Sequence, residues 1–348
     1  MRTPGFGCSV GPRHQKGGCT PPIDRRSFLT AAAALLAAPG ARAQAPFPPK
    51  PIRMLVGFAP GGATDTAARL IGEHISKLAG QPVLVDNRPG AGGIVAATAV
   101  AKAPPDGRTL ILNTSYPFVS AQGLLSSLPY DANKDFAMVT PVMGGSVLMC
   151  VHRSVPMANL REFVAHAKKT PKFAIGSWAP GSQGHLLVDA LNRHYGLAIT
   201  HVAYKGEGPM TQDVLGGQIA GGTGSLFSMI GGVKSGNLKP IAVTNGPRGT
   251  RNPMLPEVAT FQEQGFDDPS VTLSGWIGIV TTAGTPAPIV ARLNEWIRAA
   301  LAQPEIHSKL ETFGLEVVSQ SPAEFEASFR AEVPKWVKMI RDAGVKVD

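Results

Sequence analysis

Short apolar runs alternate with helical stretches along most of this chain, and glycine-rich breaks separate many of them. Strands are expected at 52–58, 83–86, 110–113, 147–151, 173–175, 199–203, 241–244 and 276–280. Helices are expected at 66–77, 94–102, 160–169, 185–194, 210–215, 289–302, 304–312 and 322–340. Such an alternation is typical of α/β folds, in which helices cover largely parallel sheets. The sequence therefore predicts an α/β protein.

The first 43 residues have the features of an export signal. The pair Arg25-Arg26 precedes an alanine-rich apolar run at 31–38, and Ala41-Arg42-Ala43 offers the small residues that a signal peptidase reads. Paired arginines are typical of the twin-arginine route, and the apolar run is shorter than the roughly 20 residues that span a bilayer. We expect residues 1–43 to be a twin-arginine signal peptide and the rest to be periplasmic.

Charge and cysteine content exclude several classes of protein. The first 43 residues hold six of the 33 Lys and Arg and one of the 24 acidic residues, so the formal net charge of +9 falls to +4 for the rest. No block of basic residues indicates a nucleic-acid partner. No run of 18 apolar residues follows the signal, so we expect a chain that is not embedded in a membrane. Cys150, inside an apolar run, is expected to be a buried thiol.

A glycine-rich corner, Phe58-Ala-Pro-Gly-Gly-Ala-Thr-Asp65, joins the first expected strand to the first expected helix. A helix that starts at such a corner exposes free N–H groups at the positive end of its dipole, and these bind carboxylates without a basic side chain. The alternative is that the two glycines only serve a tight turn. Further glycine-rich breaks lie at 87–93, 178–184 and 205–209. Because ligands bind beyond the carboxyl ends of strands in open α/β sheets, these breaks indicate a cleft that closes around a solute.

The same segments resemble the solute receptors of tripartite tricarboxylate transporters, also called Bug-type extracytoplasmic receptors. The resemblance runs from about residue 51 to the C-terminus and depends on ten short motifs in the same order. They are Phe58-Ala-Pro-Gly-Gly-x-x-Asp65, Asn87-Arg-Pro-Gly-Ala-Gly-Gly93, Pro105-Asp-Gly-x-Thr-Leu110, Leu128-Pro-Tyr-Asp131, Gly181-Ser-x-x-His-Leu186, Tyr204-Lys-Gly206, Asp213-Val-Leu-Gly-Gly-Gln218, Ala242-Val-Thr244, Trp276-x-Gly278 and Gly284-Thr-Pro286.

The resemblance implies a two-lobed periplasmic-binding-protein fold of the second type, with the ligand in the cleft between the lobes. Lobe 1 would comprise 44–147 and 275–348, and lobe 2 would comprise 148–274. It also implies a monomer with no catalytic activity, no metal and no cofactor, which captures a small organic carboxylate and delivers it to a membrane permease.

In such receptors backbone N–H groups and hydroxyls hold a ligand carboxylate. The positions that match in this chain are Gly61, Gly62, Ala63, Thr64, Asp65, Thr114 and Ser115 in lobe 1, and Gly181, Ser182, Gln183, His185, Tyr204 and Lys205 in lobe 2. Trp178, in the loop before Gly181, is expected to be a further ligand contact. Neutral donors are removed from water more cheaply than Arg or Lys and still form charge-assisted bonds to an anion.

Three of these residues keep two interpretations. Asp65 is either the N-cap of its helix or a ligand contact, and His185 either lines the site or is a packed, hydrogen-bonded histidine. Lys205 either attracts an anion or stays solvated at the rim of the cleft.

The chain departs from the family in two places. The acidic residue that usually follows the Gly-Gly-Gln segment is missing from Gly217-Gln-Ile-Ala-Gly-Gly-Thr-Gly-Ser225, which removes a partner for a ligand amine or hydroxyl, or a structural hydrogen bond. Trp178 stands where the family has a small residue; it would narrow the cleft, stack on a planar ligand or pack against the lobe.

Two other classes of protein use related designs. A sensor subunit would report the ligand to a membrane kinase, and the sequence does not separate this role from transport. A periplasmic hydrolase would need catalytic motifs, but neither a G-x-S-x-G elbow nor a P-loop occurs.

Overall fold

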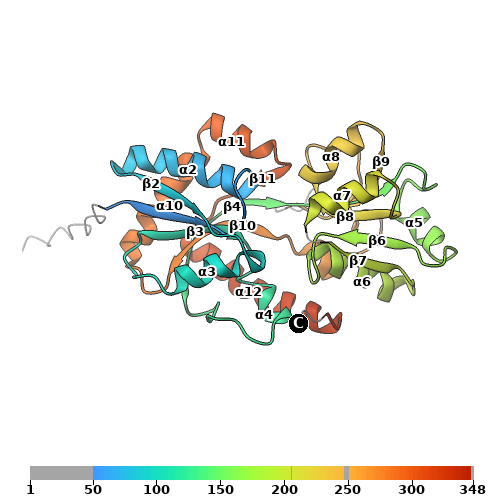
Figure 1. Cartoon of the computed structure of the whole chain (residues 1–348), viewed down its shortest axis with the longest axis horizontal. Coiled ribbons are helices and arrows are strands. Elements are labelled where there is room, and N and C mark those ends of the chain that lie inside the picture. The colour runs from blue at the N-terminus through green and yellow to red at the C-terminus, as the bar shows by residue number, and fades with distance from the viewer. Residues whose placement is uncertain (1–49, 205, 247–250, 346–348) are drawn as a thin grey trace, which may run out of the picture. The chain divides into compact units, whose positions relative to one another are not determined.

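The computed structural model describes residues 50–204, 206–246 and 251–345, whose strands form two sheets (Figure 1). The first sheet has the order β11-β4-β10-β3-β1-β2, and the second has the order β7-β6-β8-β5-β9. The first contains β1 (Ile52–Val56), β2 (Val83–Asn87), β3 (Thr109–Thr114), β4 (Phe136–Gly145), β10 (Trp276–Thr282) and β11 (Leu315–Val317). The second contains β5 (Val147–His152), β6 (Ala174–Ser177), β7 (Thr200–Ala203), β8 (Gly221–Ser225) and β9 (Leu238–Val243). The predicted signal peptide lies outside the described residues.

Both sheets have the same arrangement at their centre. In the first sheet β1 pairs in parallel with β2 and β3, and β10 runs antiparallel to β3. In the second sheet β6 pairs in parallel with β7 and β8, and β5 runs antiparallel to β8. In the first sheet β2 and β3 therefore lie on opposite sides of β1. In the second sheet β7 and β8 lie on opposite sides of β6. This reversal of strand order is where α/β sheets open a crevice for ligands.

Helices cover both faces of each sheet, which confirms the α/β prediction. They are α2 (Ala63–Ala79), α3 (Ile94–Ala101), α4 (Ala121–Leu124), α5 (Leu160–Ala167), α6 (Gln183–Tyr195), α7 (Glu207–Leu215), α8 (Leu226–Lys234), α9 (Pro269–Thr272), α10 (Ala287–Leu301), α11 (Pro304–Glu311) and α12 (Pro322–Asp342), with a short 3-10 turn, η1 (Ala91–Gly93). In the first sheet α2, α10 and α11 lie over one face, and α3, α4 and α12 lie over the other (Figure 1).

Burial on both faces explains why the strands appear in the sequence as unbroken apolar runs. Along β1, Met54 and Val56 enter the hydrophobic core under α2 and α10, and Leu55 enters the core under α3 and α12. Along β5, Met149 packs towards α5 and α6, and Cys150 packs towards α7 and α8. The buried thiol predicted for Cys150 is confirmed, and burial raises its pKa.

Three strands and three helices were not expected from the sequence: β4, β8, β11, α4, α8 and α9. Pro141 interrupts the apolar run of β4, and the pairing of β4 with β10 shifts register nearby. β8 is made largely of glycine, which has little strand preference. A Cβ on Gly222 would lie 3.2 Å from the sulfur of Met210, and one on Gly224 would lie 3.0 Å from its methyl carbon. Glycine in β8 therefore lets α7 pack directly on the strand.

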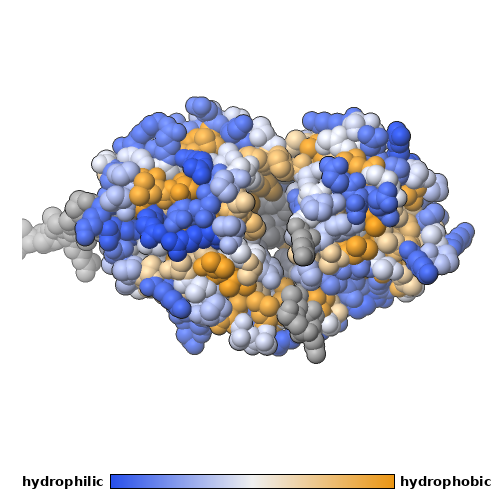
Figure 2. All heavy atoms as spheres, viewed as in Figure 1, coloured by the Kyte–Doolittle hydropathy of each residue, from blue (hydrophilic) through white to orange (hydrophobic). Residues whose placement is uncertain are grey.

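The surface carries few large exposed hydrophobic side chains. Among the described residues these are Leu78, Leu84, Val95 and Phe227. Figure 2 shows hydrophilic side chains between small hydrophobic areas on the face in view. Single exposed apolar side chains of this kind are ordinary and indicate no interface. Within the described ranges, no helix combines the length and the apolar character that crossing a membrane takes.

Candidate functional site

The corner between β1 and α2 presents unpaired backbone donors. Gly61 has a φ of +93°, a left-handed conformation that favours glycine. α2 begins at Ala63, and its N-cap, Gly62, has no side chain to cap the helix. In the described part of the chain no acceptor contacts the N–H groups of Ala63, Thr64 or Asp65, and the first helical bond runs from Thr66 N–H to the Gly62 carbonyl. The donors of this first turn are thus available to an anion.

Asp65 is the third residue of α2 rather than its N-cap, so the predicted cap position was wrong. Its carboxylate nevertheless accepts a backbone bond, from the Gly61 N–H at 2.9 Å. Arg69 Nε and Asn87 Nδ2 also donate to it, at 3.0 and 2.9 Å. The sequence placed Asp65 at the cap because it expected the helix to begin at residue 66, whereas α2 begins at Ala63, directly after Gly62. Asp65 therefore shapes the corner from inside the first turn.

The charge of Asp65 is compensated within the protein. Its side chain is 5% exposed, and Arg69 forms an ion pair with it at 2.9 Å. Burial alone would raise the pKa of Asp65, but the hydrogen bonds from Arg69, Gly61 and Asn87 outweigh burial and hold the pKa below its usual value of 3.8. Because its oxygens serve protein donors, Asp65 leaves the neighbouring N–H groups for a ligand.

The carboxyl ends of β1 and β3 meet through two glycines and an asparagine. A Cβ on Gly57 would lie 2.6 Å from the Cα of Gly93 and 2.7 Å from Asn113 Nδ2. The Asn113 side chain donates to the Gly93 carbonyl and accepts from the Thr114 N–H. This contact holds Thr114 and the buried Ser115 at the end of β3, where the Ser115 N–H donates to the Trp276 carbonyl at 2.7 Å.

The corner between β6 and α6 repeats the design of the first corner. Gly181 has a φ of +66°, and its N–H donates to the side chain four residues later, His185 Nδ1, at 2.9 Å. Ser182 is the N-cap of α6, and its Oγ accepts from the His185 N–H at 3.3 Å. The N–H groups of Gln183 and Gly184 contact no acceptor within the described residues. The first turn of α6 is therefore partly capped, whereas the first turn of α2 has no side-chain cap.

The second corner lies against elements of the first sheet. A Cβ on Gly181 would lie 2.2 Å from Cδ2 of Leu124 in α4. The Gln183 side chain donates to the carbonyls of Ser270 and Leu273, at 3.1 and 2.7 Å. The Gln183 amide therefore serves the protein itself, and its backbone N–H is the group that remains for a ligand.

Trp178 lies at the start of the second corner. It is half-buried and belongs to none of the hydrophobic cores of the described residues. A Cβ on Gly184 would lie 2.8 Å from its Cζ3, so the indole covers the first turn of α6. This contact agrees with one of the three interpretations left open by the sequence, that Trp178 packs against its own lobe, and leaves the other two as predictions.

Tyr204 and Glu207 complete the second wall. The Tyr204 hydroxyl donates to Asp213 at 2.7 Å, and burial with this bond raises its pKa to about 12. The Glu207 carboxylate accepts from the N–H and the hydroxyl of Ser225, the N-cap of α8. Glu207 thus supplies a carboxylate beside the segment that lacks the family's acidic residue. Lys205 lies outside the described residues.

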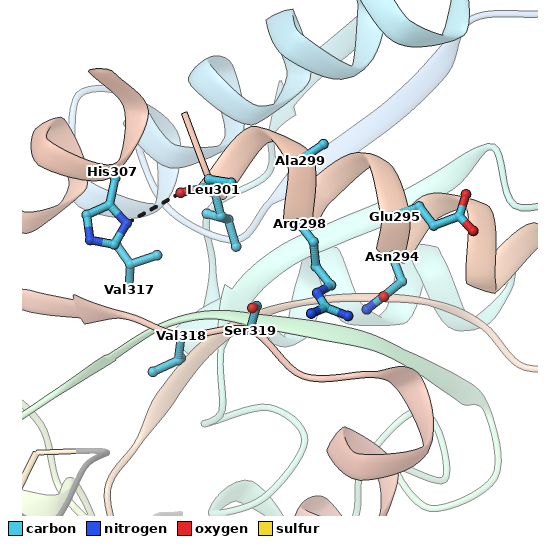
Figure 3. A pocket seen from close by; sticks show the side chains of 10 residues that line it. Asn294, Glu295, Arg298, Ala299, Leu301, His307, Val317, Val318 and Ser319 are labelled. Atoms are coloured by element: carbon cyan, nitrogen blue, oxygen red, sulfur yellow. Dashed lines mark hydrogen bonds between the residues drawn. The ribbon is translucent and has the colours of Figure 1, made fainter. Parts of the chain in front are cut away.

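Two surface cavities lie elsewhere. One, of about 600 Å³, is lined by α10, by His307 of α11 and by residues 317–319; Arg298 and Glu295 both reach its wall (Figure 3). The other, of about 550 Å³, lies between residues 272–276 and α12. There burial raises the pKa of Glu332 to about 7, although Trp276 Nε1 donates to it. Neither cavity is lined by a predicted site residue.

Several residues that shape the two corners were not predicted. They are Arg69, Asn87, Asn113, His201 and Glu207. Arg69 carried a signal, because a cation four residues after Asp65 on a helix indicates an ion pair. No sequence pattern indicated His201. It lies on β7 and stacks on His185 of α6, and only the folded structure brings these two residues together. No group of at least three His, Cys, Asp or Glu side chains arranged to hold a metal occurs in the described ranges.

The low pKa of Asp65 predicts a specific acid sensitivity. An Asp with a lowered pKa in the folded state stabilises the protein above its unfolded pKa, near 3.8, and this contribution disappears as the pH falls through the folded value. Asp65→Asn should lower the free energy of unfolding at pH 7 by about 1–3 kcal/mol, because an amide would face the donors of Gly61 and Asn87. Between pH 5 and 3, the variant should lose less stability than the parent protein.

Urea unfolding at several pH values measures this difference. Glu73→Gln, on the exposed face of the same helix and paired with Lys77, is the matched control and should change little. Equal acid sensitivity of the parent protein and Asp65→Asn would contradict the assignment.

Comparison with known proteins finds matches over most of the chain. The sequence profile of the tripartite tricarboxylate transporter family receptors matches residues 67–345. BugT from Bordetella pertussis is 32% identical over 303 residues, which cover 86% of this chain and 91% of BugT. Among solved structures, Rpa4515 of Rhodopseudomonas palustris with adipate has a TM-score of 0.75 and 31% identity, covering 86% of this chain and 100% of that one. MatC from the same organism, with bound malate, has a TM-score of 0.71 and 31% identity, covering 84% and 100%.

These matches confirm the resemblance and the periplasmic-binding-protein fold that it implied. The chain belongs to the tripartite tricarboxylate transporter receptor family.

Proposed function

We propose that this chain is an exported, periplasmic receptor that binds a small carboxylate between its two glycine corners and delivers it to a tripartite tricarboxylate-type permease. One lobe would be built on each sheet, and the lobes would close around the solute. The open first turn of α2 is the observation that carries the proposal. Its N–H groups lie beside the Thr64 hydroxyl, which has no partner among the described residues although the residue is 5% exposed. The Thr64 hydroxyl is not one of the fully buried atoms without a partner, so it is accessible to a ligand or water that would satisfy it.

The electrostatics of the corner favour an anion of low charge. Asp65, the charged residue predicted there, is neutralised by Arg69. Ser115, at the end of β3, is 9% exposed and its hydroxyl likewise has no partner among the described residues. Hydrogen bonds from neutral donors to a carboxylate are short and about twice as strong as neutral pairs. The proposed carboxylate would thus be held by the α2 donors with Thr64 and Ser115.

The first turn of α6 offers a second anchoring point of the same kind. Related receptors have been solved with adipate and with malate, which both carry two carboxylates. We therefore propose a dicarboxylate as the ligand, with its second carboxylate near the N–H groups of Gln183 and Gly184. Lys205 stays a predicted contact.

Thermal melting against a graded panel tests the proposal. The panel contains malonate, succinate, malate, glutarate, adipate, suberate, citrate and benzoate, with the corresponding methyl esters as controls. A ligand at 100 times its dissociation constant adds about 2.7 kcal/mol of stability, which raises the Tm by several degrees. We expect a rise for one narrow range of acid lengths and none for the esters. A folded protein that responds equally to acids and esters, or only to non-carboxylates, would contradict the proposal.

Thr64→Val tests the α2 corner because valine keeps the shape of threonine and removes its hydroxyl. A hydrogen bond to a charged group contributes about 1.5–3 kcal/mol, so affinity for the panel's best acid should fall about 10- to 100-fold. Thr66→Val, in the same helical turn, is the matched control and should bind normally. Calorimetric titration measures both, and unchanged affinity of Thr64→Val would place the carboxylate elsewhere.

Trp178→Ala tests the selectivity of the second corner. Removing the indole from the first turn of α6 should admit longer or bulkier acids and change the order of affinities across the panel. The free energy of unfolding should fall by much less than the roughly 3–5 kcal/mol expected for Trp336→Ala, since Trp336 is a core residue at 3% exposure. An unchanged order of affinities with a large loss of stability would show that Trp178 is structural.

A further inference from the structure

Two imidazole rings are stacked behind the second glycine corner. His185 of α6 and His201 of β7 have ring centroids 3.7 Å apart and an interplanar angle of 7°. His185 Nδ1 accepts the Gly181 N–H at 2.9 Å, and His201 Nε2 lies 2.7 Å from Ser177 Oγ. The pair therefore connects the end of β6, the neighbouring strand β7 and the first turn of α6.

The hydrogen bonds define the proton positions of this pair. Since Nδ1 of His185 accepts a bond from an N–H, it carries no proton, and the neutral ring is protonated on Nε2. The Ser177 hydroxyl donates to the Ala179 carbonyl and accepts from the Ser182 hydroxyl. His201 Nε2 must therefore donate to Ser177, which it does in its neutral form.

A proton on His185 is incompatible with this arrangement. Protonated Nδ1 would point an N–H at the N–H of Gly181, and the bond that holds the glycine corner would be lost. Protonation would also put a positive charge on the ring that stacks against His201. The Gly181 N–H thus holds His185 neutral, whereas the bond from His201 to Ser177 is compatible with either charge state of His201.

Burial favours the neutral pair, and the nearby charge opposes it. Among the described residues, Asp189 is the charged group that acts on His185; it lies on α6 and is paired with Arg193. Burial lowers the pKa of His185 below its usual value, against the opposing effect of Asp189. On the β7 side, burial and then the neighbouring His185 lower the pKa of His201 to about 4.

The first corner shows what this bond does. There the Gly61 N–H donates to Asp65, four residues later, just as the Gly181 N–H donates to His185. In both corners the bond bends a left-handed glycine back onto the first turn of the following helix. The acceptors differ, because Asp65 keeps its acceptor oxygens down to strongly acid pH whereas an imidazole loses its acceptor nitrogen on protonation.

We propose that His185 is a positioning residue of this receptor: its unprotonated Nδ1, stacked on His201, holds the Gly181 corner in the shape that binds the carboxylate, and protonation of the ring releases the ligand. This inference rests on the proposed function. It predicts that affinity is constant around neutral pH and falls below the usual imidazole pKa of 6.5, where the ring gains its proton. A dicarboxylate ligand also takes up a proton in the acid range, because its second carboxylate titrates above the ordinary value near 4. The effect of the ring is therefore the part of this fall that disappears when the imidazole is replaced.

A measurement without ligand tests the proton positions. Nitrogen-15 NMR of the imidazoles in the purified protein distinguishes the two tautomers and follows each titration. We expect His185 to be protonated on Nε2 at pH 7 and to titrate below pH 6.5, with the Gly181 amide losing its protection from hydrogen exchange over the same range. A ring protonated on Nδ1, or a titration at the ordinary value, would overturn the proposal whether or not the ligand assignment is right.

Variants of His185 test the link to binding, with adipate and malate as the probes. His185→Phe keeps a stacked ring and removes the acceptor, so affinity at pH 7 should fall about 2- to 13-fold, the range for one neutral hydrogen bond. His185→Asn places Oδ1 where Nδ1 stood; it should restore most of that loss and reduce the fall in affinity at acid pH to the part that protonation of the ligand causes. His194→Asn, in the exposed last turn of α6, is the control and should keep the parent protein's pH profile.

The outcomes separate the two proposals. Equal binding by His185→Phe and His185→Asn, or an acid profile of His185→Asn equal to that of the parent protein, would overturn the positioning role. If the parent protein binds neither probe, the ligand assignment fails, and the NMR titration still decides the protonation of the corner.

Discussion

The bond from a left-handed glycine N–H to the side chain four residues later shapes both strand-to-helix corners of this protein. It turns the chain from β1 into α2 at Gly61 and from β6 into α6 at Gly181. Positive φ angles make glycine the natural residue at both positions. The side chains of Asp65 and His185 accept from the glycine N–H groups that precede the two helices. The N–H groups in the first turn of each helix therefore remain available to a ligand beyond the carboxyl end of the strand. The two corners share this design because the two sheets share their strand order.

A third helix, α8, shows an anion of the protein itself at a helix N-terminus. The N-terminus of α8 receives a carboxylate from Glu207, which accepts both donors of Ser225. A helix N-terminus attracts negative charge through its dipole and its free N–H groups. The carboxylate of Glu207 is therefore an internal anion at the start of α8. The N–H groups of Leu226 and Phe227 in its first turn nevertheless have no acceptor in the described part of the chain, as at α2 and α6, so free donors alone do not identify a ligand site.

Sequence patterns predicted the elements whose residues carry their own signal. The apolar run of β1 and the amphipathic face of α2 were found, and the ordered motifs identified the family. β8 was missed because glycine has little strand preference. The reason for glycine there is the close packing of Met210 from α7, which the sequence does not show. Gly62 displaced Asp65 from the N-cap because a helix can start on a residue without a side-chain cap. The stack of His185 on His201 depends on the pairing of β6 with β7, which no local pattern contains.

The second corner is also coupled to the first sheet, which gives a local change at Gly181 a wider effect. Leu124 of α4 fills the space where a side chain at Gly181 would lie, and Leu186 of α6 belongs to the core under α3 and α12. Protein interiors are close-packed, so a shift of the corner by even a methyl radius disturbs such contacts. Loss of the Gly181–His185 bond would therefore alter both the donors offered to a ligand and the packing of α6 on the first sheet. A single imidazole proton would in this way affect the second corner and the packing of α6 on the first sheet together.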